Sequence, residues 1–388
     1  MNNTKKLKLL VGSGISFEAG MPKSIEIDWV LRNGHEFGLR KGCKKKYKGK
    51  IVYGKLDKDY AIKNDKDHCV KSLNDIRDLR RIQLVYRYIG RYLVFSEHNY
   101  EDIVDVMIEL ENYNQKTYNK RIYESYYNRL MKKFNMDNEE LWRFIGECIR
   151  YCKFVIQGLL SPDWINSSLD YLEIIKELNQ NFGKIDIFTL NHDLVLEKYF
   201  EKKEIEYYSG YKMIQDDFYE FDINEYGNDK PFNLYKLHGS IDIGFFSDNE
   251  RKFYGKSKID VGGIGYMNIS YEPIILTGTY GKFEEYQKSI YADLACRFKD
   301  RSKEADYFII SGYGFNDAGI NYTLINAMEC NPEMKIIMIG KNKEELTTNR
   351  RDHVISNILA WEKYKRLFWI EECFEKVTLE EIEEYISK

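Results

Sequence analysis

Six short runs of mostly apolar residues, separated by stretches of helical character, constrain the fold of this chain more than any other feature. Strands buried on both faces of a parallel sheet read as near-continuous apolar runs, and strands that alternate with helices build doubly wound sheets. The pattern therefore predicts an α/β fold with a Rossmann-like, doubly wound parallel sheet. The runs are Leu7–Val11, Ile185–Leu190, Leu234–Leu237, Pro273–Leu276, Tyr307–Ile310 and Lys335–Ile339.

A long segment of different texture, residues 35–165, separates the first run from the second. Apolar residues recur there every three or four positions, which is typical of amphipathic helices. We therefore expect a mostly helical insertion domain, 35–165, that interrupts a Rossmann-like domain made of 1–34 and 166–388. The clearest helical spacings are at 73–93, 103–110, 141–160 and in the glutamate-rich end, 371–388.

For two further segments the sequence predicts only the local structure. Residues 41–50 include six lysines and are expected to form a solvated loop. The helix expected within 371–388 has one apolar stripe, by which it can dock on its own domain or on a partner.

The composition limits the class of protein. The length of 388 residues suggests two to three domains at roughly 100–200 residues each. A net charge of -3 argues against a chain that is basic throughout, so we expect no direct contact with nucleic acid. No apolar stretch approaches the ~18 residues of a membrane span, and the apolar run near the N-terminus is too short for a signal peptide. Seven scattered cysteines are typical of reduced thiols, so we expect a cytoplasmic protein.

A glycine-rich turn, residues 12–16 with the sequence Gly-Ser-Gly-Ile-Ser, follows the first apolar run directly. Glycines let a backbone come close to a phosphate, and a following helix N-terminus adds partial positive charge. The spacing does not match the dinucleotide fingerprint, because Phe17 stands where the third glycine belongs, nor does it match a P-loop. From these residues alone, the turn is either a phosphate-binding turn or a tight strand-to-helix connection without a ligand.

Polar residues follow two more of the strand-like runs. Asn191 and Asp193 come directly after Leu190, and His238 stands before Gly239 after the next run. Carboxyl ends of strands in an open α/β sheet face the ligand crevice, and histidine exchanges protons near neutral pH. Each has a structural alternative: the first two can cap the next helix, and His238 can be a hydrogen-bonded core histidine.

Small-residue turns also follow the last two runs of the predicted sheet, and Asp317 is placed to cap the helix after the first of them. We predict no metal site. Cys148 and Cys152 share one helical face, but without a second cysteine pair they indicate core packing. The two turns are Gly312-Tyr313-Gly314 and Gly340-Lys341-Asn342.

Taken in order, these motifs resemble those of the sirtuin family, over about 1–30 and 180–345. The resemblance implies that NAD+ binds as a substrate at the carboxyl edge of the sheet. It implies that Asn191 orients the nicotinamide ribose or the attacking water, and that His238 is the general base. The matching segments are 12–16, 20–22, 189–193, 237–239 and 312–314. The NAD+-binding residues that the resemblance implies are Gly12, Ser13, Gly14, Ile15, Ser16, Asp193, Gly312, Tyr313, Gly314 and Asn342.

The chain also departs from the deacylating members of that family. Lys23 and Ser24 stand where those enzymes carry Phe-Arg, and 240–311 contains only Cys296 where they carry the two cysteine pairs of a zinc module. The chain is more similar to the sirtuin-like NADases of bacterial anti-phage defence, above all to the subunits paired with a HerA-type hexameric ATPase.

That similarity implies a homo-oligomeric NAD+ glycohydrolase, an effector of abortive infection that converts NAD+ to ADP-ribose and nicotinamide and so depletes NAD+ in infected cells. Such a reaction needs positioning and a base but no metal. Two other functions stay open. One is an NAD-dependent protein deacylase, and the other is a non-catalytic sensor subunit that binds NAD or ADP-ribose.

Overall fold

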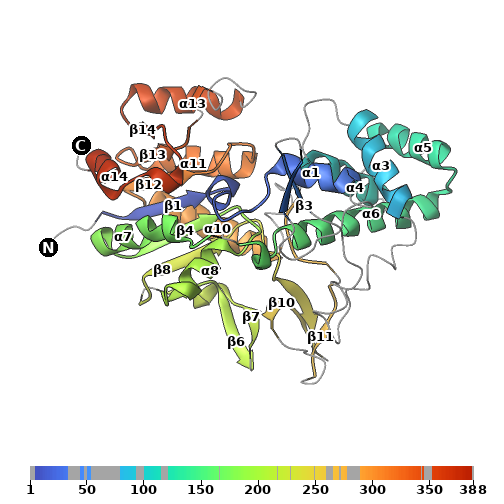
Figure 1. The fold of residues 1–388 in the computed structure, drawn as a ribbon, viewed down its shortest axis with the longest axis horizontal. Helices are drawn as coiled ribbons and strands as arrows, with labels where there is room; N and C mark the ends of the chain where they lie inside the picture. The colour runs from blue at the N-terminus through green and yellow to red at the C-terminus, as the bar shows by residue number, and fades with distance from the viewer. Residues whose placement is uncertain are drawn as a thin grey trace.

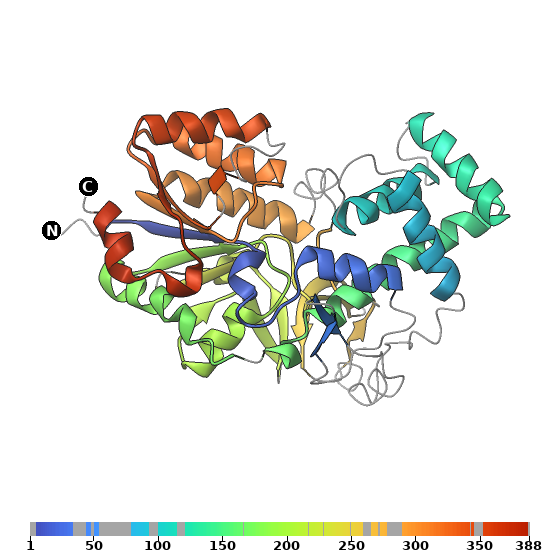
Figure 2. The same cartoon turned by 45° about the horizontal axis from the view of Figure 1, so that its top comes forward.

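The structure is a computed structural model. A sheet flanked by helices and a separate group of helices lie side by side in it (Figure 1). Turning the molecule shows the same division (Figure 2). The residues that the structure describes are 5–33, 44–47, 50–53, 79–92, 100–114, 121–165, 167–215, 217–227, 229–248, 250–258, 265–270, 272–277, 289–341, 343–344 and 352–386.

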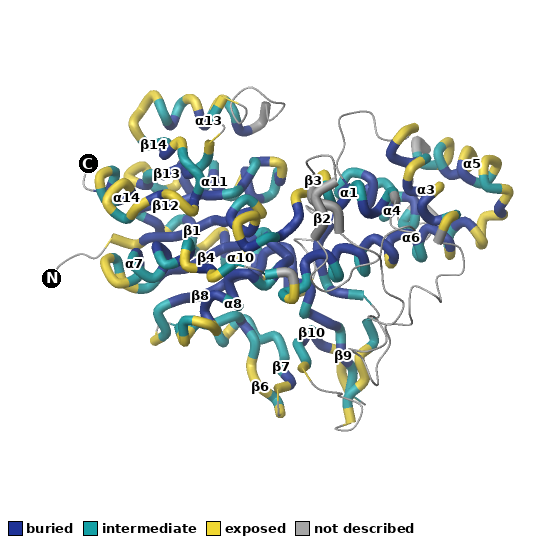
Figure 3. The backbone as a smooth tube through the Cα atoms, viewed as in Figure 1, coloured by how far each residue is buried: buried dark blue, intermediate teal, exposed yellow. Residues whose placement is uncertain are grey.

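A parallel sheet of seven strands forms the centre of the α/β part, which confirms the predicted fold class. Five of the six apolar runs are strands of this sheet, and they are buried along almost their whole length (Figure 3). In spatial order the strands are β14 (Leu367–Ile370), β13 (Lys335–Ile339), β12 (Tyr307–Ser311), β1 (Leu7–Val11), β4 (Ile185–Thr189), β8 (Phe232–Lys236) and β5 (Tyr207–Tyr208).

Helices cover both faces of this sheet. Side chains alternate along each buried strand, so each strand presents apolar side chains to both layers of helices. Leu9 of β1 belongs to the apolar cluster that includes α7, α8 and α14, whereas its neighbour Leu10 belongs to the cluster that includes α10, α11 and α13. The helices are α7 (Glu173–Phe182), α8 (Val195–Lys202), α10 (Ser289–Lys303), α11 (Ala318–Cys330), α13 (Asp352–Lys363) and α14 (Leu379–Ile386).

The face beneath α10 also carries buried charge. Lys8 of β1, Asp186 of β4 and Asn233 of β8 are neighbours in the strand register, and all three are buried. The Lys8 ammonium group pairs with Asp186, which also accepts a hydrogen bond of 2.7 Å from Asn233 Nδ2. Arg301 Nε of α10 lies 4.0 Å from the same carboxylate. The cluster compensates charges that would be costly to bury alone.

The segment after α1 is largely helical in its described part, as the apolar spacing predicts. Its longest helix, α6, begins with a capping box in which Asp137 and Glu140 each accept a hydrogen bond from the other's backbone N–H. Within the described ranges, no helix is both long and apolar enough to cross a lipid bilayer. The helices of this part are α3 (Leu79–Tyr92), α4 (Tyr100–Asn114), α5 (Arg121–Phe134) and α6 (Asn138–Leu159), and α1 (Ser24–Asn33) packs against α3, α4 and α6.

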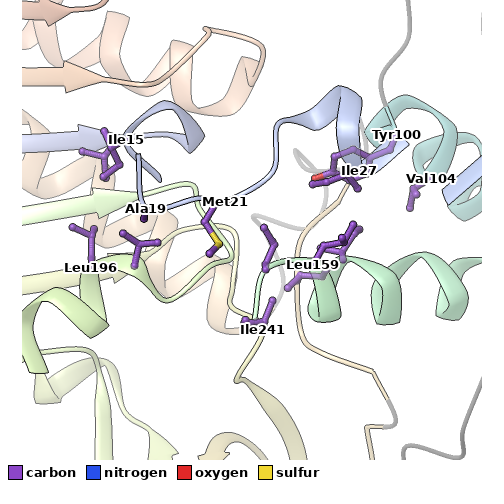
Figure 4. Close-up of a cluster of buried hydrophobic side chains, with 14 of the residues drawn as sticks. Ile15, Ala19, Met21, Ile27, Tyr100, Val104, Leu159, Leu196 and Ile241 are labelled. Carbon is purple, nitrogen blue, oxygen red and sulfur yellow. The ribbon is translucent and has the colours of Figure 1, made fainter. Parts of the chain in front are cut away.

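One apolar cluster runs from the sheet into these helices (Figure 4). Ile15, Ala19 and Met21 lie in the segment between β1 and α1, with Leu196 of α8 on the sheet side and Leu159 on the α6 side. The segment that carries the glycine turn is therefore packed from both parts of the molecule. The domain boundaries at 34 and 165 stay a prediction.

Two local expectations need correction, and one sheet was not expected. Residues 273–276, expected as a strand, contribute only an isolated bridge from Ile275 to Gly239. The lysine-rich run 41–50, expected as a loop, contains one strand and the first residue of a second strand that pairs with it antiparallel, because backbone pairing does not need apolar side chains. A second, antiparallel sheet was not predicted, because its strands are short and mix polar with aromatic residues. The strands are β2 (Lys44–Tyr47) and β3 (Lys50–Tyr53), and in the second sheet β11 (Met267–Asn268), β9 (Gly244–Ser247), β10 (Lys252–Ser257), β7 (Phe218–Phe221) and β6 (Tyr211–Gln215).

The C-terminal helix docks on its own domain, which settles the alternative left open by its apolar stripe. Ile382 and Ile386 of α14 are buried in the cluster that includes α7. The carbonyl oxygen of Ile386 accepts a hydrogen bond of 3.0 Å from the Tyr307 hydroxyl group at the start of β12.

Candidate active site

The direction in which the chain continues across the sheet reverses between β1 and β12. From β1 the chain continues to β4 on one side of the sheet, whereas from β12 it continues to β13 and β14 on the other side. This reversal is a topological switch point, where open α/β sheets bind ligands beyond the carboxyl ends of their strands. Both strands that flank it are followed by the predicted glycine turns, 12–16 and 312–314.

The two glycine turns pack directly against each other. Gly14 N donates a hydrogen bond of 3.2 Å to Gly312 O. A Cβ atom on Gly12 or Gly14 would lie 2.4 or 2.5 Å from backbone atoms of Gly312, which itself has a φ angle of +66°. Backbone packing alone therefore demands glycine at all three positions, and the turn still exposes Ser13 at the edge of the sheet.

The exchange Gly312→Ala should destabilise the fold through this contact. The added Cβ would meet backbone atoms of Gly12 and Gly14 at 2.8 Å. Gly183→Ala is the matched control, because Gly183 has a φ angle of +77° but open space around the added Cβ. We expect Gly312→Ala to lose about 1–3 kcal/mol more unfolding free energy in urea than the control. Equal losses would contradict the steric argument.

Asn191 lies against the first glycine turn. Its Nδ2 donates hydrogen bonds of 3.0 Å to Gly12 O and 3.1 Å to Ser16 Oγ, and its backbone N donates to Thr189 Oγ1. Asn191 is 7 % exposed. These bonds tie the end of β4 to the turn after β1 and do not cap α8. None of them uses Oδ1, the oxygen that can accept a hydrogen bond from water or a hydroxyl group.

Asp193 has a structural role at the start of α8. Its Oδ1 accepts a hydrogen bond of 3.0 Å from Val195 N, as the capping interpretation of the sequence states. Its carbonyl oxygen accepts a hydrogen bond from the Lys236 ammonium group, which lies 3.1 Å from Glu197 Oε1. Lys236 thereby fastens the loop that carries Asn191 to the end of β8.

A second pair of opposite charges lies near Lys236. Lys256 Nζ lies 2.9 Å from Asp242 Oδ2. Burial alone would raise the pKa of Asp242, but Lys256 and Lys236 lower it below its ordinary value. The carboxylate therefore stays ionised and balances the two ammonium groups near the carboxyl end of β8.

His238 follows β8 and contacts the carboxylate of Asp317, a residue from the other side of the switch point. Its Nε2 lies 3.0 Å from Oδ2 of Asp317, which follows β12. Both side chains are 5 % exposed. The ring of His192 lies nearby, with its centroid 6.2 Å from that of His238. The structure thus brings together residues from the ends of β8, β4 and β12.

Sequence reasoning missed this second role of Asp317. The predicted helix cap is confirmed, since Asp317 Oδ1 accepts a hydrogen bond of 3.0 Å from Ile320 N at the start of α11. The sequence contains only a weak signal for the pairing of Asp317 with His238. Both residues follow shortly after a strand, and they have no other feature in common.

The remaining predicted residues differ in what they offer to a ligand. Ile15 is a core residue, 1 % exposed. The Tyr313 side chain is buried, and its hydroxyl group donates a hydrogen bond of 2.8 Å to Asn321 Oδ1. Gly314 is half-buried, and Asn342 lies outside the described residues.

The chemistry available at this edge is proton transfer and hydrogen bonding. It offers an imidazole paired with a carboxylate, an amide held against a glycine turn, and the positive N-terminal end of α11. Among the residues that the structure describes, no group of three or more His, Cys, Asp or Glu side chains is placed to hold a metal ion.

Comparison with known proteins gives one family match and two structural alignments. Residues 186–367, from β4 to β14, match the model of the SIR2-like domain family. No curated protein matches the chain. Two solved structures, each 12 % identical with a TM-score of 0.37, align with 99 % of this chain. One, described as "Structural Basis for the Mechanism and Regulation of Sir2 Enzymes", is covered to 93 %, and the other, "Crystal Structure of a Sir2 Homolog-NAD Complex", to 91 %.

Proposed function

We propose that the chain is an NAD+ glycohydrolase, which cleaves NAD+ with water to give ADP-ribose, nicotinamide and a proton. The observation that carries the proposal is the convergence of Asn191 and the His238–Asp317 pair on the switch point, where Asn191 bonds directly to the glycine turn. The match of residues 186–367 to a SIR2-like domain supports a substrate of the NAD class.

The proposed reaction exchanges one bond at the ribose. The bond between C1′ and the nicotinamide nitrogen breaks, and nicotinamide leaves as a neutral molecule with the bonding electrons. The oxygen of water bonds to C1′, and its proton passes to His238. A positively charged leaving group makes the step chiefly a matter of positioning and of one base.

The proposed binding mode follows the two glycine turns. The turn at Ser13, which is exposed, receives the pyrophosphate, as a glycine-rich turn at a strand end allows. Asn191 Oδ1 accepts a hydrogen bond from the attacking water or a ribose hydroxyl group. Gly314, together with Gly340 after β13, borders the adenosine half, and the loop of Asp193 borders the nicotinamide.

The setting of the activity belongs to the same proposal. By its resemblance to the sirtuin-like NADases of anti-phage defence, we expect a homo-oligomer in the cytoplasm that depletes NAD+ in infected cells. A HerA-type hexameric ATPase is the proposed partner. Size measurement of the chain alone and mixed with that ATPase tests both assembly expectations.

Nicotinamide release from NAD+ by the purified chain tests the function. We expect turnover without any peptide, in the chain alone or together with its proposed partner, and ADP-ribose as the second product. Turnover only in the presence of an acyl-lysine peptide would identify a deacylase. Tight NAD+ binding in calorimetry with no product under either condition would identify a sensor subunit, and both outcomes contradict the proposal.

A further inference from the structure

We propose that Gln157 of α6 is a positioning residue for the proposed reaction, because its side chain holds the loop that carries His238. Gln157 Nε2 donates a hydrogen bond of 3.0 Å to the carbonyl oxygen of Ile241, shortly after His238. The two partners are 84 positions apart in the sequence, and α6 belongs to the group of helices beside the sheet. The inference rests on the proposed function, in which His238 is the general base.

Backbone hydrogen bonds join this loop to its neighbours on both sides. Ser240 N donates a hydrogen bond of 3.1 Å to Ile274 O. Ile241 N donates one of 3.1 Å to the carbonyl oxygen of His192, in the loop after β4. Ile241 therefore connects α6 to the loops that follow β4 and β8, and these two loops carry the proposed catalytic residues.

Gly239, next to His238, couples the position of the loop to that of the imidazole. It has a φ angle of +75°, and a Cβ atom there would lie 2.3 Å from the carbonyl oxygen of Ile274 and 2.8 Å from the Tyr291 hydroxyl group. The His238 carbonyl oxygen accepts a hydrogen bond of 2.8 Å from Leu276 N. The backbone around His238 is in such close contact with the 272–277 segment that a shift of the loop moves the imidazole with it.

Two other contacts bring α6 to this part of the molecule, but neither defines a direction. Leu159 and Ile241 lie in one apolar cluster, and apolar contacts are not directional (Figure 4). Arg150 Nε lies 3.9 Å from Glu272 Oε2, and an ion pair between such partly exposed side chains contributes little. The amide of Gln157 does define a direction, since a hydrogen bond weakens steeply as it departs from linearity.

The size of the expected effect separates positioning from stability. One hydrogen bond adds only a small part to the stability of a folded chain. A displacement of about 1 Å at a reacting group, in contrast, can lower a rate about 100-fold. Removal of the donor should therefore affect turnover much more than the melting temperature. The proposed pyrophosphate turn follows β1, a different strand, so KM should change little.

Gln157→Met tests the assignment, because methionine keeps an unbranched side chain with good helix propensity but donates no hydrogen bond. We expect kcat for nicotinamide release to fall about 10- to 100-fold, with a small change in KM. The melting temperature should fall by at most about 3 °C. Hydrogen exchange, followed by mass spectrometry, should become about 2- to 10-fold faster in the peptide that contains 240–243, because one bond fewer holds the loop.

Two further variants show whether the donor is the cause. In Gln157→Lys the ammonium group can donate to the same carbonyl oxygen, so we expect kcat and the exchange rate to return to within a few-fold of the wild type. Gln180→Met is the matched control, because it makes the same substitution at an exposed position of α7. It should leave kcat, KM and exchange at 240–243 unchanged.

Turnover in Gln157→Met equal to or above that of the wild type would overturn the inference, since the contact would then be neutral or would restrain the site. A Gln157→Lys variant as slow as Gln157→Met would overturn it as well, because the donor would not be the cause. A wild-type chain without NAD+ turnover, in which Gln157→Met still speeds exchange at 240–243 and Gln157→Lys reverses it, would instead contradict the proposed function.

Discussion

His238→Gln is expected to lower the rate of nicotinamide release about 10²–10⁴-fold, the range typical of losing a positioned general base. Glutamine can still donate a hydrogen bond toward Asp317 Oδ2, so the carboxylate keeps a partner and the fold is spared. It cannot accept the proton from water at neutral pH. Initial rates at saturating NAD+, with the melting temperature of each protein as a check on folding, measure the effect.

The same exchange at His192 provides the control. His192 is buried to a similar extent, follows the neighbouring strand, and has its ring centroid 6.2 Å from that of His238. We expect His192→Gln to retain activity within a few-fold of the wild type. If both variants lost activity equally, the assignment of His238 as the base would be wrong.

Asp186→Ala is expected to reduce the free energy of unfolding by about 3–5 kcal/mol, the typical result of breaking a buried ion pair from one side. The substitution leaves the Lys8 ammonium group inside the sheet without its carboxylate, and it removes the acceptor of Asn233 Nδ2. Urea denaturation followed by circular dichroism gives the change in stability.

Two controls separate the buried charge from the loss of a side chain. Glu139→Ala breaks an exposed i,i+4 pair with Arg143 and should cost at most ~0.5 kcal/mol. The double variant Lys8→Met/Asp186→Leu removes both buried charges and should recover much of the lost stability. A double variant as unstable as Asp186→Ala would mean that packing, and not the unpaired charge, causes the loss.

The strands of the parallel sheet could be predicted because both of their faces are buried. Such a strand needs apolar residues at almost every position, as in Tyr307–Ile310, and the pattern is visible in the sequence without any contact information. The second sheet could not be predicted in this way. Its strands carry polar residues beside aromatic ones, and they pair through backbone groups that every residue type has.

Part of the candidate site could also be predicted. Asn191, His238 and the two glycine turns each follow an apolar run, and parallel strands end at one edge of the sheet, so their proximity follows from the sequence pattern. The partner of His238 did not follow. Asp317 lies 79 positions away, and its capping role is sufficient to explain an aspartate at that position.

The sequence by itself determined the class of fold, because strands that are buried on both faces consist mostly of apolar residues. It also determined the edge of the sheet at which functional residues are expected, because the polar motifs follow those strands. Only the tertiary structure decided which polar groups meet: Lys8 with Asp186, Asn191 with Gly12, and His238 with Asp317. Those pairings depend on strand order, register and loop paths. No single sequence records them, since a hydrogen bond between distant residues leaves no periodic pattern along the chain.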